Sequence, residues 1–154
     1  MTTLVTGASG HLGANLVRRL LKDGQAVRVL LRQGNNNAAV AGLDVERVYG
    51  DLRNKSSIVA AVKGCEYVYH TAAKISTLYG YPHLQQELYD CNVLGTRYLL
   101  HAAIETGVNR VVVTSSCEAM GYKVGEPNNE NTPVYPFASI LPYALTKVFA
   151  EHEC

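Results

Sequence analysis

One tyrosine and one lysine near the C-terminal end of the sequence have a spacing that suits proton-transfer chemistry. Of the ten tyrosines, only Tyr143 is followed four residues later by a lysine, Lys147, and on a helix this spacing places both side chains on one face. A neighbouring ammonium stabilises a phenolate, so we expect the pKa of Tyr143 to fall from its free value of about 10 toward neutrality. Such a phenol can exchange a proton with an alcohol or carbonyl oxygen. The same pair also occurs on ordinary half-exposed helices, so its meaning depends on its surroundings.

Hydroxyl side chains follow a predicted strand upstream of this pair. The run Val111–Val113 is typical of a strand with both faces covered, and Thr114, Ser115 and Ser116 come directly after it. A hydroxyl at this edge of a sheet can hydrogen-bond a reacting oxygen and orient it. The residues alone leave open which of the three does so, and Thr114 is also a candidate cofactor contact.

A glycine-rich turn lies between the first predicted strand and the first predicted helix. Its glycines, at positions 7, 10 and 13, follow the spacing G-x-x-G-x-x-G, which differs from the G-x-G-x-x-G fingerprint of many dinucleotide sites. They permit a tight turn, a close approach of the backbone to a pyrophosphate, and close packing of helix on strand. The phosphates would bind the free N–H groups at the start of the helix; a glycine turn without a ligand is the alternative. The candidate cofactor contacts here are Gly7, Ser9, Gly10, His11, Leu12 and Gly13.

The residue after the second predicted strand bears on the choice of dinucleotide. NAD sites commonly place a carboxylate about twenty residues beyond the glycine turn, where it binds the ribose 2′-hydroxyl, whereas this chain has Arg32. A guanidinium attracts the 2′-phosphate of NADP, so the sequence favours NADP and leaves NAD possible. Asp51 follows the third strand and could accept a hydrogen bond from the adenine amino group or cap local N–H groups. Lys147 would hydrogen-bond the ribose hydroxyls and hold the nicotinamide ring in place. A positively charged nicotinamide would stabilise the Tyr143 phenolate further, so the predicted fall in its pKa depends on both positive charges.

Composition excludes several classes of protein. The 154 residues carry a formal charge of +1 without a basic run, so we expect no nucleic-acid partner. The apolar runs are only strand-sized and the N-terminus does not have the pattern of a signal peptide, so we expect a cytoplasmic protein that does not cross a membrane. The four cysteines lack the paired spacing of zinc or redox sites, so we predict no metal site and thiols that are reduced and structural.

Short β-rich runs alternate with helical patterns, which predicts one α/β domain over residues 1–154 with a parallel sheet covered on both faces. The segment from Gly121 to Pro142 contains four prolines and is predicted to be a loop. The predicted strands are Thr3–Thr6, Ala26–Leu31, Val45–Tyr49, Tyr67–His70 and Arg110–Ser115. The predicted helices are one carrying Leu12 to Leu21, a short one capped near Asn54, a long one from Leu84 to Thr106, and one from Pro142 to the last residue.

Six segments of the sequence form an ordered set: Thr6–Gly13 (TGASGHLG), Gly50–Leu52 (GDL), His70–Ala73 (HTAA), Asn92–Thr96 (NVLGT), Val113–Ser116 (VTSS) and Tyr143–Lys147 (YALTK). Over essentially its whole length the chain resembles the extended short-chain dehydrogenases/reductases. Within that superfamily it is most similar to the NAD-dependent epimerase/dehydratase group, near dihydroflavonol 4-reductases and 3β-hydroxysteroid dehydrogenases. The resemblance implies a Rossmann-type doubly wound sheet with about five strands present.

The resemblance also implies roles for individual residues. Tyr143 would be the general acid/base, Lys147 its electrostatic partner, and Ser116 rather than Ser115 the third catalytic residue. Asn92 would brace the active-site side of the long helix and lie at the cofactor site. The other cofactor contacts that the resemblance implies are Asp51, Leu52, Ala72, Ala73 and Lys74.

These observations lead to three hypotheses of function. The first is an oxidoreductase that transfers hydride between NADP(H) and a secondary alcohol or ketone of a small molecule. The second is a nucleotide-sugar epimerase or dehydratase with tightly bound NAD, and the third is an NAD(P)-binding module without catalysis. Family members continue beyond the Tyr143 helix, so we expect C-terminal strands and a substrate lobe to be missing here. The resemblance further implies a homodimer through the helices 84–106 and 142–154.

Overall fold

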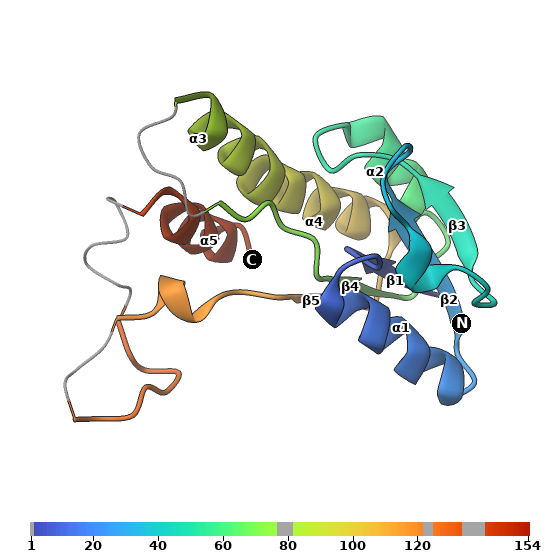
Figure 1. Ribbon diagram of the computed structural model, residues 1–154, viewed down its shortest axis with the longest axis horizontal. Coiled ribbons are helices and arrows are strands. Elements are labelled where there is room, and N and C mark those ends of the chain that lie inside the picture. The colour runs from blue at the N-terminus through green and yellow to red at the C-terminus, as the bar shows by residue number, and fades with distance from the viewer. Residues whose placement is uncertain (1, 77–81, 122–124, 134–140) are drawn as a thin grey trace.

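The computed structural model describes residues 2–76, 82–121, 125–133 and 141–154, and the described residues form a parallel sheet of five strands (Figure 1). The strands lie in the order β3-β2-β1-β4-β5, and β1 pairs with both β2 and β4. The chain adds β2 and β3 on one side of β1 and then crosses over to add β4 and β5 on the other side. This is a Rossmann arrangement, and the predicted α/β fold is confirmed. The strands are β1 (Thr2–Thr6), β2 (Ala26–Leu31), β3 (Glu46–Tyr49), β4 (Tyr67–His70) and β5 (Arg110–Val113).

Helices cover the sheet because each carries an apolar face that is buried against the strands. α1 (His11–Lys22) packs on one face of the sheet, and α2 (Lys55–Val62) and α4 (Gly95–Thr106) pack together on the other (Figure 1). Gly24 follows α1 in the left-handed conformation, which agrees with its prediction as a helix stop.

Successive side chains of β1 point to opposite faces of the sheet, so the strand contributes to two separate parts of the hydrophobic core. Leu4 is fully buried together with Ile58 and Leu99 on the α2–α4 side. Val5 is fully buried with Val17 on the α1 side. β1 is therefore surrounded on both faces, and its last residue leads directly into the glycine turn.

The prediction that both faces of the last strand are covered is wrong for β5. This strand lies at the edge of the sheet, and the exposed fraction of Val112 is 45%. Val111 packs on the α2–α4 core, whereas α1 packs on β1 and β2 and leaves the other face of β5 open. The strand also ends at Val113, so the hydroxyl-bearing residues that follow lie in an irregular segment.

The predicted long helix is present but is not uniform. It consists of α3 (Pro82–Tyr89), a π-turn (Asp90–Leu94) and α4, and Gly107 follows it in the left-handed conformation. A π-turn inserts an extra residue into one helical turn, so the faces before and after it no longer share one register. In this protein the π-turn carries Asn92 into the buried interior.

The last helix, α5 (Pro142–His152), begins at the proline where the sequence predicts a helix start. It packs against α3 and the π-turn (Figure 1). An edge-to-face contact between Tyr89 and Phe149 and a 2.7 Å ion pair between Arg97 and Glu153 join it to the helices beside it.

The described part of the segment between β5 and α5 contains a 3₁₀ turn (Cys117–Ala119) and a β-bridge residue, Met120, and is otherwise irregular. Residues 122–124 and 134–140 of the predicted loop lie outside the described residues. In the described ranges, no helix has both the length and the apolar character needed to cross a membrane. The four cysteines are free thiols.

Candidate active site

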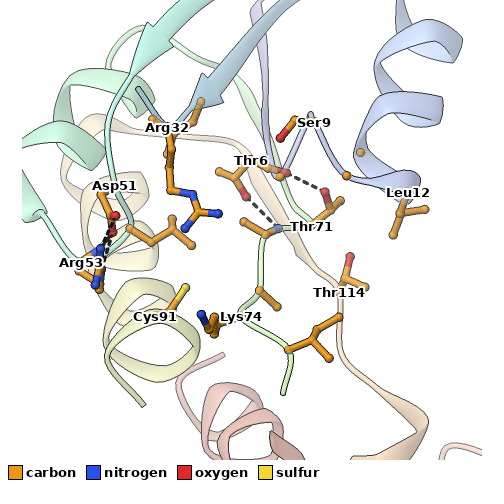
Figure 2. Close-up of a pocket in the computed structure, with 18 of the residues that line it drawn as sticks. Thr6, Ser9, Leu12, Arg32, Asp51, Arg53, Thr71, Lys74, Cys91 and Thr114 are labelled. Carbon is orange, nitrogen blue, oxygen red and sulfur yellow. Dashed lines mark hydrogen bonds and ion pairs between the residues drawn. The ribbon is translucent and has the colours of Figure 1, made fainter. Parts of the chain in front are cut away.

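A cavity of about 660 Å³ opens at the carboxyl ends of the central strands, where ligands of such sheets bind (Figure 2). The glycine turn forms one part of its wall and α5 forms another, so segments that are far apart in the sequence meet in one place. The candidate cofactor contacts that line the cavity are Gly7, Ser9, Gly10, His11, Leu12, Gly13, Arg32, Asp51, Leu52, Ala72, Ala73, Lys74, Thr114, Tyr143 and Lys147.

The glycine turn depends on the absence of side chains. Gly7 has a φ of +70°, and a Cβ on it would lie 2.7 Å from the backbone nitrogen of Ala72. A Cβ on Gly13 would collide with the carbonyl group of Gly7. The turn can therefore close, and α1 can approach β1, only with glycine at these two positions.

The first turn of α1 presents backbone donors to the cavity. Gly10 is the N-cap, so no side chain accepts hydrogen bonds from the first N–H groups, and the first turn contains no acidic residue. Such a helix start carries a partial positive charge that binds phosphate groups. The residues present here therefore fit the pyrophosphate of a dinucleotide.

Lys147 is held inside the structure by a backbone group. Its exposed fraction is 5%, and Nζ donates a hydrogen bond of 2.6 Å to the carbonyl oxygen of Thr114. Burial lowers the pKa of Lys147, and the nearby carboxylate of Glu151 acts in the opposite direction. An ammonium has three donors, and the described residues accept one of them, so two are available to groups in the cavity as far as the structure describes it.

Tyr143 lines the same cavity, but its ionisation differs from the prediction. Burial raises the pKa of the Tyr143 phenol, and the Ser116 side chain acts in the opposite direction. The fall expected from the ammonium is not present in this structure, because burial has the larger effect, and the part that depends on a positively charged nicotinamide stays a prediction. The ammonium of Lys147 donates a hydrogen bond to the Thr114 carbonyl and is not among the groups that affect the pKa of Tyr143.

The two consecutive serines take different places. The Ser116 side chain accepts the backbone N–H of Glu118 at 3.2 Å and lies close enough to Tyr143 to oppose the rise in its pKa, and it is not among the described residues that line the cavity. Ser115 lines the cavity, and its hydroxyl is hydrogen-bonded to the carboxylate of Glu151 on α5. The structure thus brings the phenol together with Ser116, the serine that the family resemblance implies.

Charged side chains surround the end of the cavity beside β2 and β3. Arg32 extends toward the centre of the cavity, and Asp51 forms a two-point ion pair with Arg53 (Figure 2), with Nε–Oδ1 and Nη2–Oδ2 distances of 2.9 and 2.8 Å. The Arg53 side chain is the main cause that holds the pKa of Asp51 below its usual range. Asp51 also accepts the backbone N–H of Arg53 at 2.9 Å. Local capping is therefore present at Asp51, and the contact with adenine stays a prediction.

Asn92 lies behind the cavity and connects two of its parts. Its Nδ2 donates to the carbonyl oxygen of Lys74 at 2.9 Å and to Thr146 Oγ1 at 3.0 Å, and its Oδ1 accepts the Lys74 N–H at 2.8 Å. Thr146 in turn donates to the carbonyl oxygen of Tyr143. Asn92 thus links the segment after β4 to α5, and it is not among the described residues that line the cavity, so its contact with the cofactor stays a prediction.

The cavity wall also contains residues that the sequence does not single out. Arg53 is charged, Cys91 has a pKa that burial raises, and Glu87 forms a 3.1 Å ion pair with Lys74. Arg53 has a detectable signal, because it follows a turn aspartate by two residues. The Cys91 side chain faces the cavity because of the π-turn, and the hydrophobic pattern of the sequence does not predict that turn.

A family model for the NAD dependent epimerase/dehydratase family matches residues 3–154. The chain belongs to this family. The resemblance drawn from the six sequence segments is therefore confirmed, and the cavity lies at the position where Rossmann sheets in general bind their ligands. The expected likeness to dihydroflavonol reductases and 3β-hydroxysteroid dehydrogenases is also confirmed among the relatives.

Individual relatives and structures show the same likeness. The chain is 51% identical over 153 residues to sterol demethylase protein B of Methylococcus capsulatus, which covers 99% of this chain and 46% of the relative. It is 36% identical to a putative dihydroflavonol 4-reductase of Synechocystis, covering 97% of this chain and 43% of the relative. The crystal structure of Thermus thermophilus UDP-glucose 4-epimerase with NAD superposes with a TM-score of 0.82 at 32% identity, covering 99% of this chain and 48% of that one. The chain thus spans less than half the length of these family members.

Proposed function

We propose that this chain is the dinucleotide-binding and proton-transfer part of an oxidoreductase that transfers hydride between NADP(H) and a secondary alcohol or ketone of a small molecule. The observation that carries the proposal is that one cavity is lined both by the glycine turn and by Tyr143 and Lys147. A phosphate cradle alone would support binding only. The phenol of Tyr143 and the ammonium of Lys147 add the groups that a proton transfer requires.

The residues of the chain divide the work within the cavity. The backbone donors at the start of α1 bind the pyrophosphate, and the two free donors of Lys147 bind ribose hydroxyls. The bound dinucleotide supplies or accepts the hydride. Tyr143 donates or accepts the proton at the substrate oxygen, and the Ser116 side chain near the phenol eases its ionisation.

Arg32 supports NADP rather than NAD as the preferred cofactor. It lines the cavity at the end of β2, where a carboxylate would bind the ribose 2′-hydroxyl of NAD. A guanidinium instead attracts a 2′-phosphate and can bind it at two points. The nearby carboxylate of Asp51 is paired with Arg53, which reduces its repulsion of a phosphate.

The proposal is tested by titrating the purified chain with NADPH and NADH by fluorescence and then screening small ketones and aldehydes for NADPH oxidation. We expect NADPH binding and a turnover that Tyr143→Phe abolishes while binding stays unchanged. Tyr67→Phe is the matched control, because Tyr67 begins β4 at the opposite edge of the sheet. Turnover that survives in Tyr143→Phe would contradict the role of Tyr143, and binding without any turnover would favour a binding module.

A nucleotide-sugar epimerase or dehydratase with tightly bound NAD is a second candidate function. Its support is the 32% identity to the NAD-bound Thermus thermophilus UDP-glucose 4-epimerase. It predicts that denaturing the purified protein releases NAD and that the reaction consumes no net cofactor. Arg32 speaks against it, because no carboxylate stands at that position for the ribose hydroxyl.

We also propose that the protein forms a homodimer through α4 and α5. The support on these helices is that two large apolar side chains remain exposed, Ile104 at 79% and Phe149 at 40%. Sedimentation of the chain is expected to show a dimer that Ile104→Glu dissociates. A wild-type monomer at high protein concentration would contradict the proposal.

A further inference from the structure

The His70 side chain joins two parts of the fold that meet at the cavity. It is the last residue of β4, and its exposed fraction is 3%. Its Nδ1 lies 2.7 Å from Thr6 Oγ1 on β1, and its Nε2 lies 3.1 Å from Thr96 Oγ1 on α4. Both ring nitrogens are therefore engaged with hydroxyl groups, one on each side.

The directions of these hydrogen bonds follow from the other partners of the two threonines. Thr96 Oγ1 donates its only proton to the carbonyl oxygen of Asn92 at 2.6 Å, so it can only accept from His70 Nε2–H. Nδ1 of a neutral ring is then an acceptor, and Thr6 Oγ1 donates to it. The Thr6 hydroxyl in turn accepts the backbone N–H of Ala72 at 3.3 Å.

The result is a one-way chain of hydrogen bonds from Ala72 through Thr6, His70 and Thr96 to Asn92. It requires the neutral ring with its proton on Nε2. Burial and the positive charge of Lys147 lower the pKa of His70 to about 4, so the ring is neutral at neutral pH. A doubly protonated ring would place a second N–H against the Thr6 hydroxyl, and the chain would break at that point.

The two ends of this chain lie at different parts of the binding site. Thr6 and Ala72 line the cavity, and Thr6 precedes Gly7, the residue that makes the tight turn. Asn92 holds the backbone of Lys74 and the side chain of Thr146. His70 therefore stands between the glycine turn and the π-turn, although neither His70 nor Thr96 is among the described residues that line the cavity.

We infer that His70 is a positioning residue for dinucleotide binding: by bridging Thr6 and Thr96, it fixes the glycine turn relative to the π-turn and α5. The inference rests on the proposed binding of NADP(H). It predicts that a change at Thr96, which does not line the cavity, weakens cofactor binding. A residue that served stability alone would leave the affinity of the folded protein unchanged.

The test uses the whole chain, NADPH titrations and three variants that are first checked for folding. Thr96→Val keeps the shape but removes the hydroxyl, and we expect NADPH to bind at least about fivefold more weakly, since a buried donor on His70 loses its acceptor. Thr96→Ser restores the hydroxyl and is expected to bind within about twofold of wild type. Ile58→Val is the control, because it removes a buried methylene from the same core at a site away from the cavity and should leave affinity unchanged.

A nitrogen-15 NMR spectrum of the histidine rings gives a second measurement that does not depend on any variant. We expect His70 to show a protonated Nε2 and an unprotonated Nδ1. The opposite tautomer, or unchanged affinity in Thr96→Val, would overturn the inference while leaving cofactor binding intact. A wild-type chain that binds neither NADPH nor NADH would instead overturn the proposed function, and the positioning role with it.

Discussion

The Lys147 ammonium lies 2.6 Å from the carbonyl oxygen of Thr114, and this hydrogen bond ties α5 to the segment that leaves β5. A flexible lysine side chain normally samples many conformations, and ordering it costs up to about 2 kcal/mol. Here that ordering is completed by folding, so a ligand meets an ammonium that is already in place. Pre-ordering of this kind favours binding without additional contacts.

Replacing this lysine should separate binding from stability. We expect Lys147→Met to weaken NADPH binding about tenfold, or about 1.4 kcal/mol, because the donors toward the ribose are lost. Stability should change by less than about 1 kcal/mol, since the removed charge is poorly solvated but the Thr114 carbonyl loses its partner. Fluorescence titration and thermal unfolding measure the two effects. Lys63→Met, beyond the end of α2 and exposed, is the control that should change neither.

Two glycines with the same backbone conformation provide a test of the cradle. Gly7 and Gly24 have φ values of +70° and +74°, but only Gly7 has backbone atoms where a Cβ would lie. Gly24→Ala should cost about 1–2 kcal/mol from the left-handed conformation alone and leave NADPH affinity unchanged. Gly7→Ala should cost more and abolish measurable binding. Equal effects of the two substitutions would show that crowding at the turn is unimportant.

Substitution of Arg32 should change the choice of dinucleotide. We expect Arg32→Ser to lower NADPH affinity by roughly tenfold to a hundredfold, through loss of a charge-assisted contact of about 1.5–3 kcal/mol. NADH affinity should hardly change, because NADH carries no 2′-phosphate. Arg19→Ser removes an equal charge from the far end of α1 and serves as the control. If the ratio of the two affinities stays the same in Arg32→Ser, Arg32 does not select the cofactor.

The buried His70 should make the protein less stable as the pH falls. Its pKa is about 4 in the folded chain and about 6.5 when unfolded, so between these values the unfolded state binds the extra proton. The free energy of unfolding should therefore decrease as the pH falls from about 6.5 to about 4, by up to about 3 kcal/mol from this residue, and the term is absent above pH 6.5. Protonation of carboxylates with a lowered pKa, such as Asp51, also decreases the free energy of unfolding at lower pH. The difference between wild type and His70→Asn in urea unfolding at several pH values isolates the histidine, and parallel curves would contradict the assignment.

Local patterns were sufficient to predict the frame of this protein. The strand before Gly7, the helix after it and the helix starting at Pro142 each carry a signal within a few residues, and all three are present. Because parallel strands place their carboxyl ends at one edge, the same patterns predicted that the glycine turn and the hydroxyls after the fifth strand lie at one site, and the family resemblance implied that Tyr143 acts there. That meeting is seen in the cavity.

What could not be predicted depends on contacts between distant segments. The exposure of Val112 follows from which strand lies at the sheet edge, and the raised pKa of Tyr143 follows from the burial that tertiary packing creates. Capping of a local N–H group by Asp51, seen at Arg53, was one of two roles that the sequence left open, whereas the ion pair of Asp51 with the Arg53 side chain was not predicted. The bridge made by His70 joins β1 to α4 and has no periodic signal at all.

The widened turn from Asp90 to Leu94 also limits how this chain can vary in length. Successive residues of an α-helix are rotated by about 100° around the axis, so removing one residue from the widened turn would restore uniform winding and swing everything before it by that angle. Tyr89 would then leave Phe149, and the Asn92 amide would turn away from Thr146. A natural variant with a single-residue deletion here should therefore be rarer than one with any conservative replacement at the same positions.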